Sequence, residues 1–148
     1  MAITENSIVP HRVSAALAVL RGVVGIIFVA HGAQKLFTYG LAGVSGSFAG
    51  MGIPLPGIAG PAVAFLEFFG GIALILGLLT RLAALGLAIT MLGAIFMVHL
   101  AAGFFMPQGY EFVLALFGVA VALAVAGAGE YSLDAVIARR RGGVAARV

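Results

Sequence analysis

The sequence alternates long apolar segments with short segments that are rich in glycine, proline and charged residues. A helix needs about 20 apolar residues to cross a hydrocarbon core about 30 Å thick. Four segments approach or exceed this length: residues 13–36, 61–79, 82–102 and 109–128. The pattern therefore predicts an all-α fold, an integral membrane bundle of four transmembrane helices.

The breaks between the apolar segments predict how the helices are connected. Residues 37–60 are rich in glycine and contain Pro54 and Pro56, which indicates a loop that is re-entrant or lies on the membrane surface. Pro61 fits the first turn of the second helix, where a missing N–H has no cost. Only residues 80–81 join the second and third segments, so these helices are predicted to be antiparallel neighbours.

The end of the chain is polar and basic. After residue 128 the chain leaves the membrane, and Ser132 can cap a short helix from Leu133 to Arg140. Four of the eight Lys and Arg residues lie here, as is typical of a segment beside anionic lipid head groups: Arg139, Arg140, Arg141 and Arg147. We treat residues 1–148 as one domain with a basic tail, 129–148. Nucleic-acid binding is not expected, since the basic residues do not form a cluster on a folded face.

Charge distribution predicts the orientation. Arg12, Arg81 and the four tail arginines lie on one side of the membrane and Lys35 lies on the other, so the positive-inside rule places both termini in the cytoplasm. The composition, 63% hydrophobic and 9% charged, cannot supply a water-exposed surface. We therefore expect a multi-pass membrane protein. The absence of cysteine excludes disulfides and thiol exchange by this chain.

Ionisable residues inside the apolar segments are the candidate functional groups, because burying a charge in a membrane costs several kcal/mol or more. They are Arg21, His31 and Lys35 in the first segment, Glu67 in the second, His99 in the third and Glu111 in the fourth. At about 1.5 Å per residue, all except Arg21 fall in the outer third of the membrane. Arg21 lies deeper, where it could snorkel towards the cytoplasm.

Helical periodicity predicts where these residues point. Each of three segments carries ionisable residues on a face with small neighbours, which allow helices to approach closely. These faces are Arg21, Gly25, Phe28, His31, Gly32 and Lys35; Glu67, Gly70, Gly71 and Leu74; and Glu111, Ala115, Gly118 and Ala122. We therefore expect them to contact other helices. His99 is different, since it points about 120° away from the glycine face of its segment.

Aromatic residues gather in the same outer half: Phe65, Phe68, Phe69, Phe96, Phe104, Phe105 and Phe112. Aromatic walls with a few convergent polar groups are typical of a pocket for a flat organic molecule. The interpretation assigns proton transfer to the catalytic candidates Glu67 and His31. The predicted ligand-binding residues are Lys35, His99, Glu111, Arg21, Phe65 and Phe69.

Each assignment has a purely structural alternative. Glu67 could instead make an interhelical bond to Lys35, Arg21 or His31. Lys35 could simply snorkel outwards. A haem or metal, held by the two histidines alone or with Glu67 and Glu111, is less favoured because the Glu-x-x-His motif of di-iron bundles is absent, so no metal site is predicted. The residues themselves leave the cofactor otherwise unknown.

Several short motifs, taken in order, resemble the DoxX family of small bacterial membrane proteins. They are Arg21…Gly25…Phe28…His31-Gly32…Lys35-Leu36, Phe48-Ala49-Gly50-Met51-Gly52-Ile53-Pro54, Glu67…Gly70-Gly71…Gly77-Leu78…Thr80-Arg81, Gly109-Tyr110-Glu111 and Ser132-Leu133-Asp134. The resemblance covers nearly the whole chain. It implies a four-helix bundle in a bacterial inner (plasma) membrane and a redox or quinone neighbourhood, with a quinone as the candidate cofactor. Relatives in this family are linked to a terminal quinol oxidase, to thiosulfate:quinone oxidoreduction and to membrane-bound oxidant defence.

Three functions are compatible with this sequence. The first is a membrane subunit of a quinone-linked redox system that binds a quinone or a similar lipid-soluble ligand. The second is a non-catalytic scaffold whose buried polar cluster only specifies helix packing. Transport is the third, and it is disfavoured because no inverted repeat is evident. Expected partners are membrane lipid and either other membrane redox subunits or further copies of the chain. Whether the chain is itself an enzyme is left open, because it has no redox-active side-chain set.

Overall fold

The computed structural model describes the backbone of residues 5–145 and the side chains of residues 11–141. Within this range the chain is helical and has no strand, which confirms the all-α class. The elements are α1 (Glu5–Ala33), the π-helical turn η1 (Gln34–Tyr39), α2 (Gly40–Gly50), α3 (Pro56–Leu76), α4 (Thr80–Ala94), the π-helical turn η2 (Ile95–His99), the 3-10 turn η3 (Leu100–Ala102), α5 (Glu111–Ala126) and α6 (Leu133–Ala145).

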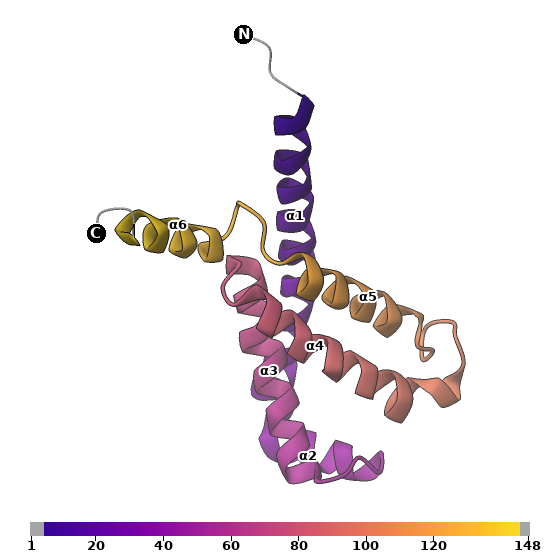
Figure 1. The fold of residues 1–148 in the computed structure, drawn as a ribbon. Helices are drawn as coiled ribbons and strands as arrows, with labels where there is room; N and C mark the ends of the chain where they lie inside the picture. The colour runs from indigo at the N-terminus through magenta and orange to yellow at the C-terminus, as the bar shows by residue number, and fades with distance from the viewer. Residues whose placement is uncertain (1–4, 146–148) are drawn as a thin grey trace.

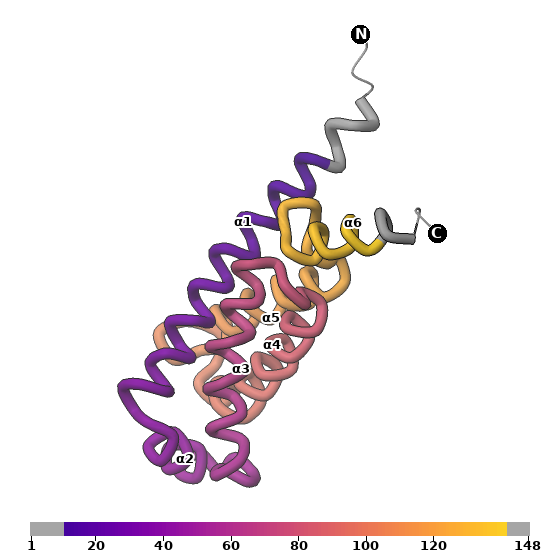
Figure 2. The backbone as a smooth tube through the Cα atoms, turned by 90° about the vertical axis from the view of Figure 1, so that its left-hand side faces the viewer, coloured from indigo at the N-terminus to yellow at the C-terminus, as the bar shows by residue number. Residues whose placement is uncertain are grey.

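The helices form two antiparallel pairs, α1 with α3 and α4 with α5, and contacts between α3 and α4 join the pairs (Figure 1). The helical segments 11–50, 56–76 and 80–102 are each long and apolar enough to cross a membrane, whereas α5 is shorter, with 16 residues. The start of α1, the α3–α4 turn and α6 lie at one end of the bundle, here called the terminal end (Figure 2). The opposite end, with α2 and the α4–α5 loop, is called the far end.

Glycines bring the backbones of α1 and α3 into direct contact. A Cβ atom at Gly71 would lie 2.7 Å from both the Gly25 oxygen and the Val29 nitrogen. One at Gly32 would overlap the backbone of Phe68. Small residues allow this close approach in membrane helices. The predicted contact face of the second segment is therefore confirmed. That of the first segment is confirmed at Gly25 and Gly32, whereas His31 is exposed.

Arg21 lies at the terminal end and does not snorkel, contrary to the prediction. Its side chain is 1% exposed. Its Nη2 donates to the Tyr131 carbonyl at 2.6 Å, and its Nη1 donates to the Leu74 carbonyl at 3.4 Å. The reason is that two backbone carbonyls, one near the end of α3 and one just before α6, accept from the guanidinium inside the protein.

Helix α6 is tied to the same end by Asp134. Its carboxylate accepts hydrogen bonds from the backbone N–H groups of Leu79 and Thr80, at 2.8 and 3.0 Å, and so caps the N-terminus of α4. The predicted cap of α6 itself is confirmed, since the Ala135 N–H donates to the Ser132 hydroxyl at 3.2 Å. The α3–α4 turn and α6 therefore form one hydrogen-bonded unit.

The predicted loop 37–60 is wrong, because most of it is helical. Residues 40–50 form α2, which packs on α3 and buries Val44 there. A Cβ atom at Gly60 would lie 3.2 Å from Val44 Cγ1, so the glycine allows close contact. Tertiary packing here outweighs the low helix propensity of glycine. The predicted helix start is also wrong, because Pro56 occupies the first turn of α3 and leaves Pro61 inside the helix.

The predicted contact face of the fourth segment is also wrong. Ala115, Gly118 and Ala122 are exposed. The residues that α5 buries are Val113, Leu116, Ala120 and Leu123. The buried face of α5, which includes leucine and valine side chains, packs against α4, and its small-residue face points outward.

The α1–α3 contact predicts a difference between two glycine substitutions. Gly71→Ala should lower the midpoint of thermal unfolding in mild detergent, because overpacking at this contact costs about 1–3 kcal/mol. Gly22→Ala is the matched control, since a Cβ atom there would meet nothing within 4 Å. Equal midpoints for the two variants would contradict close α1–α3 contact.

The orientation predicted from the arginines is testable because the chain has no cysteine. We expect Ser47→Cys, in the far-end helix α2, to react with a membrane-impermeant maleimide added to intact cells. Ala138→Cys, in α6, should react only after permeabilisation. The reverse pattern would place the termini outside.

Candidate functional site

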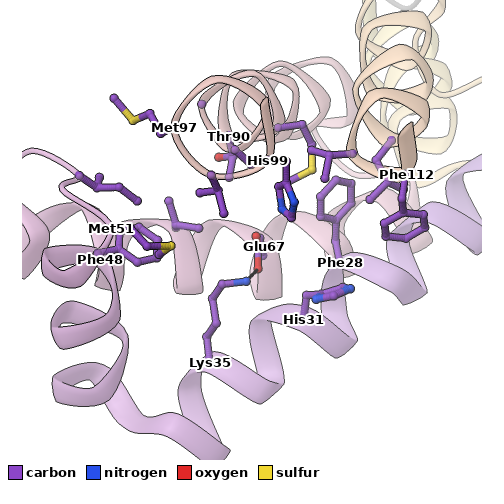
Figure 3. Close-up of a pocket in the computed structure, with 18 of the residues that line it drawn as sticks. Phe28, His31, Lys35, Phe48, Met51, Glu67, Thr90, Met97, His99 and Phe112 are labelled. Carbon is purple, nitrogen blue, oxygen red and sulfur yellow. Dashed lines mark hydrogen bonds and ion pairs between the residues drawn. The ribbon is translucent and has the colours of Figure 1, made fainter. Parts of the chain in front are cut away.

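A cavity of about 530 Å³ lies at the far end, between the two helix pairs (Figure 3). Its wall is mostly apolar and includes side chains from all four long helices and from α2. The lining residues are Phe28, His31, Lys35, Phe48, Met51, Ile53, Ala59, Val63, Glu67, Ile89, Thr90, Met91, Gly93, Ala94, Met97, Val98, His99, Met106, Pro107, Phe112, Val113 and Leu116. The volume suits a small organic ligand.

Lys35 and Glu67 form an ion pair across the α1–α3 contact. Lys35 Nζ lies 2.5 Å from Glu67 Oε2, and the two side chains are 22% and 5% exposed. The alternative that Lys35 snorkels outwards is therefore wrong, and the alternative of an interhelical bond between Glu67 and Lys35 is confirmed. The pair forms because a buried carboxylate strongly favours a cation within reach, and the close backbones bring the two side chains together.

Two of the cavity's polar side chains, Lys35 and His99, come from π-helical turns. Lys35 lies in η1 and His99 lies in η2. A π-helical turn is wider than an α-helical turn and is often found at functional sites. Extrapolation at 100° per residue fails across such a turn, which is why His99 lines the cavity although the sequence pattern placed it on another face.

A hydrogen bond orients the His99 ring. Its Nδ1 lies 2.9 Å from the Gln108 carbonyl oxygen. A carbonyl oxygen only accepts, so Nδ1 carries the hydrogen and the Nε2 of neutral His99 keeps a free lone pair. Figure 3 shows His99 on the opposite side of the cavity from Lys35, with Glu67 between them. His31 contributes a second imidazole from α1.

The other predicted ligand-binding residues do not line the cavity. Arg21 is bonded at the terminal end, as described above. Phe65 and Phe69 are stacked with ring centroids 6.2 Å apart and are 43% and 57% exposed on the outer surface of α3. Glu111 accepts a hydrogen bond from the Met106 N–H at 2.7 Å. It therefore organises the loop that supplies Met106 and Pro107 to the cavity wall.

Most of the apolar residues that line the cavity were not predicted from the sequence pattern. Of the phenylalanines predicted to form a pocket, only Phe112 lines it, together with Phe28 and Phe48. All four methionines of the described residues also line it, and the sequence analysis assigned them no role: Met51, Met91, Met97 and Met106. These residues come from separate segments, so no local spacing could reveal their convergence.

The cavity provides proton-transfer groups in an apolar setting. Glu67, His31 and His99 can exchange protons, and Lys35 can donate to an oxygen atom of a ligand. Among the residues whose placement is described, no group of three or more His, Cys, Asp or Glu could hold a metal ion. Electron transfer would need a group that these side chains do not supply.

These features define a class: a small multi-pass membrane protein with a polar pair and two histidines in an apolar cavity. The DoxX family model matches residues 16–100, and the model described as TQO small subunit DoxD matches residues 62–147. The chain belongs to the DoxX family of bacterial membrane proteins.

Three relatives illustrate the family. The chain is 33% identical to the Bacillus subtilis protein named putative oxidoreductase CatD, over 86% of this chain and 92% of the relative. It is 34% identical to the Escherichia coli inner membrane protein YqjF, over 82% and 92%. An uncharacterized membrane protein of Mycobacterium tuberculosis is 33% identical over 86% and 85%. No solved structure matches the chain significantly.

The ion pair predicts strong coupling between its two members. Lys35→Met should destabilise the protein by about 3–5 kcal/mol, because it leaves the Glu67 carboxylate buried without a partner. The double variant Lys35→Met/Glu67→Gln should recover most of that loss. Unfolding of both variants in the same detergent measures the coupling, and additive losses would exclude an energetically important pair.

Proposed function

We propose that this protein is an integral membrane subunit of a quinone-linked redox system and binds a quinone or a similar lipid-soluble ligand in the far-end cavity. The observation that carries the proposal is the presence of Glu67, Lys35, His31 and His99 in the lining of one cavity whose remaining wall is mostly apolar. The cavity encloses polar hydrogen-bonding groups beside aromatic rings. Such a combination orients a flat ring that has oxygen atoms at its edge.

The protein's groups match both redox states of such a ring. A quinone carbonyl accepts hydrogen bonds, and Lys35 Nζ is the donor on the α1 side. A quinol hydroxyl donates, and the free Nε2 of His99 is an acceptor on the opposite side. Reduction of the ring takes up two electrons and two protons. Glu67 and His31 would pass the protons, and a partner subunit would supply the electrons.

The rim of the cavity suits a ligand with an apolar tail. Ile89, Met97 and Met51 line the cavity and are 63%, 51% and 42% exposed. In a membrane, exposed apolar residues of this kind face lipid. An apolar tail could therefore leave the cavity directly into the bilayer, while the polar ring stays beside Glu67.

The comparisons support a redox setting. One matching model is that of DoxD, a thiosulfate:quinol oxidoreductase subunit, and one relative carries an oxidoreductase name. We therefore propose membrane redox subunits as partners. We also propose the bacterial inner membrane as the location, as in the name of the Escherichia coli relative.

Quinone binding can be measured on the purified chain in mild detergent, with a short-tailed quinone as the probe. Phe112→Ala should raise the Kd at least tenfold, about 1.4 kcal/mol, because it removes part of the ring-contacting wall. Glu67→Gln should raise it comparably. Phe65→Ala is the matched control, since that ring lies outside the cavity.

The same experiment separates quinone binding from a scaffold role. The Lys35–Glu67 pair also joins α1 to α3, so a scaffold predicts that Glu67→Gln changes stability alone. A folded wild-type protein that binds no quinone, or a Phe112→Ala variant that behaves like Phe65→Ala, would reject the cavity as the quinone site.

A further inference from the structure

The wall of the far-end cavity contains an unusual concentration of thioether groups. The chain has five methionines, and the four in the described part of the structure all line this cavity. They come from different places along the chain: Met51 at the end of α2, Met91 in α4, Met97 in η2 and Met106 in the α4–α5 loop. Folding therefore gathers every described thioether around one space, together with two imidazoles.

One of the four thioethers is buried and the other three are exposed at the rim of the cavity. Met91 is 6% exposed and belongs to the hydrophobic core. The other three are partly open to the surroundings: Met51 is 42% exposed, Met97 is 51% exposed and Met106 is 55% exposed. Methionine side chains are unbranched and flexible, so thioethers that line one cavity can move towards a common centre.

The His99 ring has the orientation that a metal ligand needs. Metal-bound histidines usually donate their second ring N–H to a carbonyl or carboxylate, which fixes the tautomer and directs the other nitrogen at the ion. The 2.9 Å contact between His99 Nδ1 and the Gln108 carbonyl provides this support and leaves Nε2 free. Gln108 lies in the same loop as Met106, so the loop that orients the imidazole also supplies a thioether.

The chemistry of these donors selects a soft monovalent ion. Thioether and imidazole ligands favour Cu(I), whereas Zn²⁺, Fe and Mg²⁺ sites rely on thiolates, carboxylates or clusters of histidine. Within the described residues, clusters of His, Cys, Asp and Glu that could hold a metal are absent. The one buried carboxylate of the cavity, Glu67, is already paired with Lys35.

We propose that the far-end cavity binds one Cu(I) ion between His99 Nε2, the Met91 thioether and at least one rim thioether. Met106 is the first candidate for the rim ligand, because it lies in the loop that orients His99. The exposed thioethers of Met51 and Met97 serve as entry ligands at the rim. This site shares His99 with the proposed quinone site. It does not use Glu67 or Phe112, so substitutions of those two residues distinguish the two proposals.

The test is a Cu(I) titration of the full-length protein in mild detergent under anaerobic reductant, with bathocuproine disulfonate as the competing chelator. The wild type should withdraw one equivalent of Cu(I) from the chelator, and X-ray absorption should show sulfur and nitrogen neighbours. Met91→Leu, which conserves side-chain volume, should weaken Cu(I) binding at least tenfold. His99→Gln should weaken it to a similar extent.

Two controls distinguish this site from surface binding and from the quinone site. His11→Gln alters an exposed histidine outside the cavity and should leave Cu(I) affinity unchanged. Glu67→Gln should also retain Cu(I), even where it loses quinone. The proposal is overturned if the folded wild type takes no Cu(I) from the chelator, or if Met91→Leu and His99→Gln bind it as tightly as the wild type.

Discussion

The direct contact between the backbones of α1 and α3 is the constraint on which the candidate site depends. Lipid supplies little hydrophobic drive for helices to associate, so close packing and polar bonds must do so. Gly25, Gly32 and Gly71 permit this packing, since a Cβ atom at any of them would collide with the facing helix. Because the two helices lie so close, Lys35 reaches Glu67 and the buried carboxylate has a partner. The same glycine contact thus supports both the fold and the polar centre of the cavity.

The two ends of the bundle are built differently. At the terminal end, Arg21 donates to the Leu74 and Tyr131 carbonyls, and the Asp134 carboxylate accepts from the Leu79 and Thr80 N–H groups. This end is closed by hydrogen bonds between segments far apart in the chain. At the far end, the helix pairs are separated by a cavity, and π-helical turns interrupt both α-helices that supply Lys35 and His99. A fixed end and an open end are compatible with a rigid scaffold that presents a ligand site.

The cavity contains groups suited to two kinds of ligand, which share His99 and otherwise use different side chains. The carboxylate, the ammonium group and the aromatic wall suit an oxygen-bearing ring, whereas the thioethers and the oriented imidazole suit a soft metal ion. Both assignments agree with a family linked to membrane redox systems. His99 belongs to both, because the bond from its Nδ1 to the Gln108 carbonyl leaves one nitrogen available for either a hydroxyl or a metal. The loop between α4 and α5, held by Glu111, therefore has a direct influence on the site.

The sequence by itself determined the properties that depend on one segment at a time. Run length and turn residues predicted the four helices, Ser132 predicted the cap of α6, and periodicity placed Glu67 on the buried glycine face of α3. The tertiary structure decided which side chains meet. Lys35 forms an ion pair with Glu67 and does not extend into solvent, and Arg21 donates hydrogen bonds to backbone carbonyls. Glu111 accepts a hydrogen bond from a loop N–H. The tertiary structure also made residues 40–50 helical and gathered the methionines. The physical reason is that periodicity is a property of one helix, whereas pairing depends on the rotation, separation and π-helical turns of its neighbours.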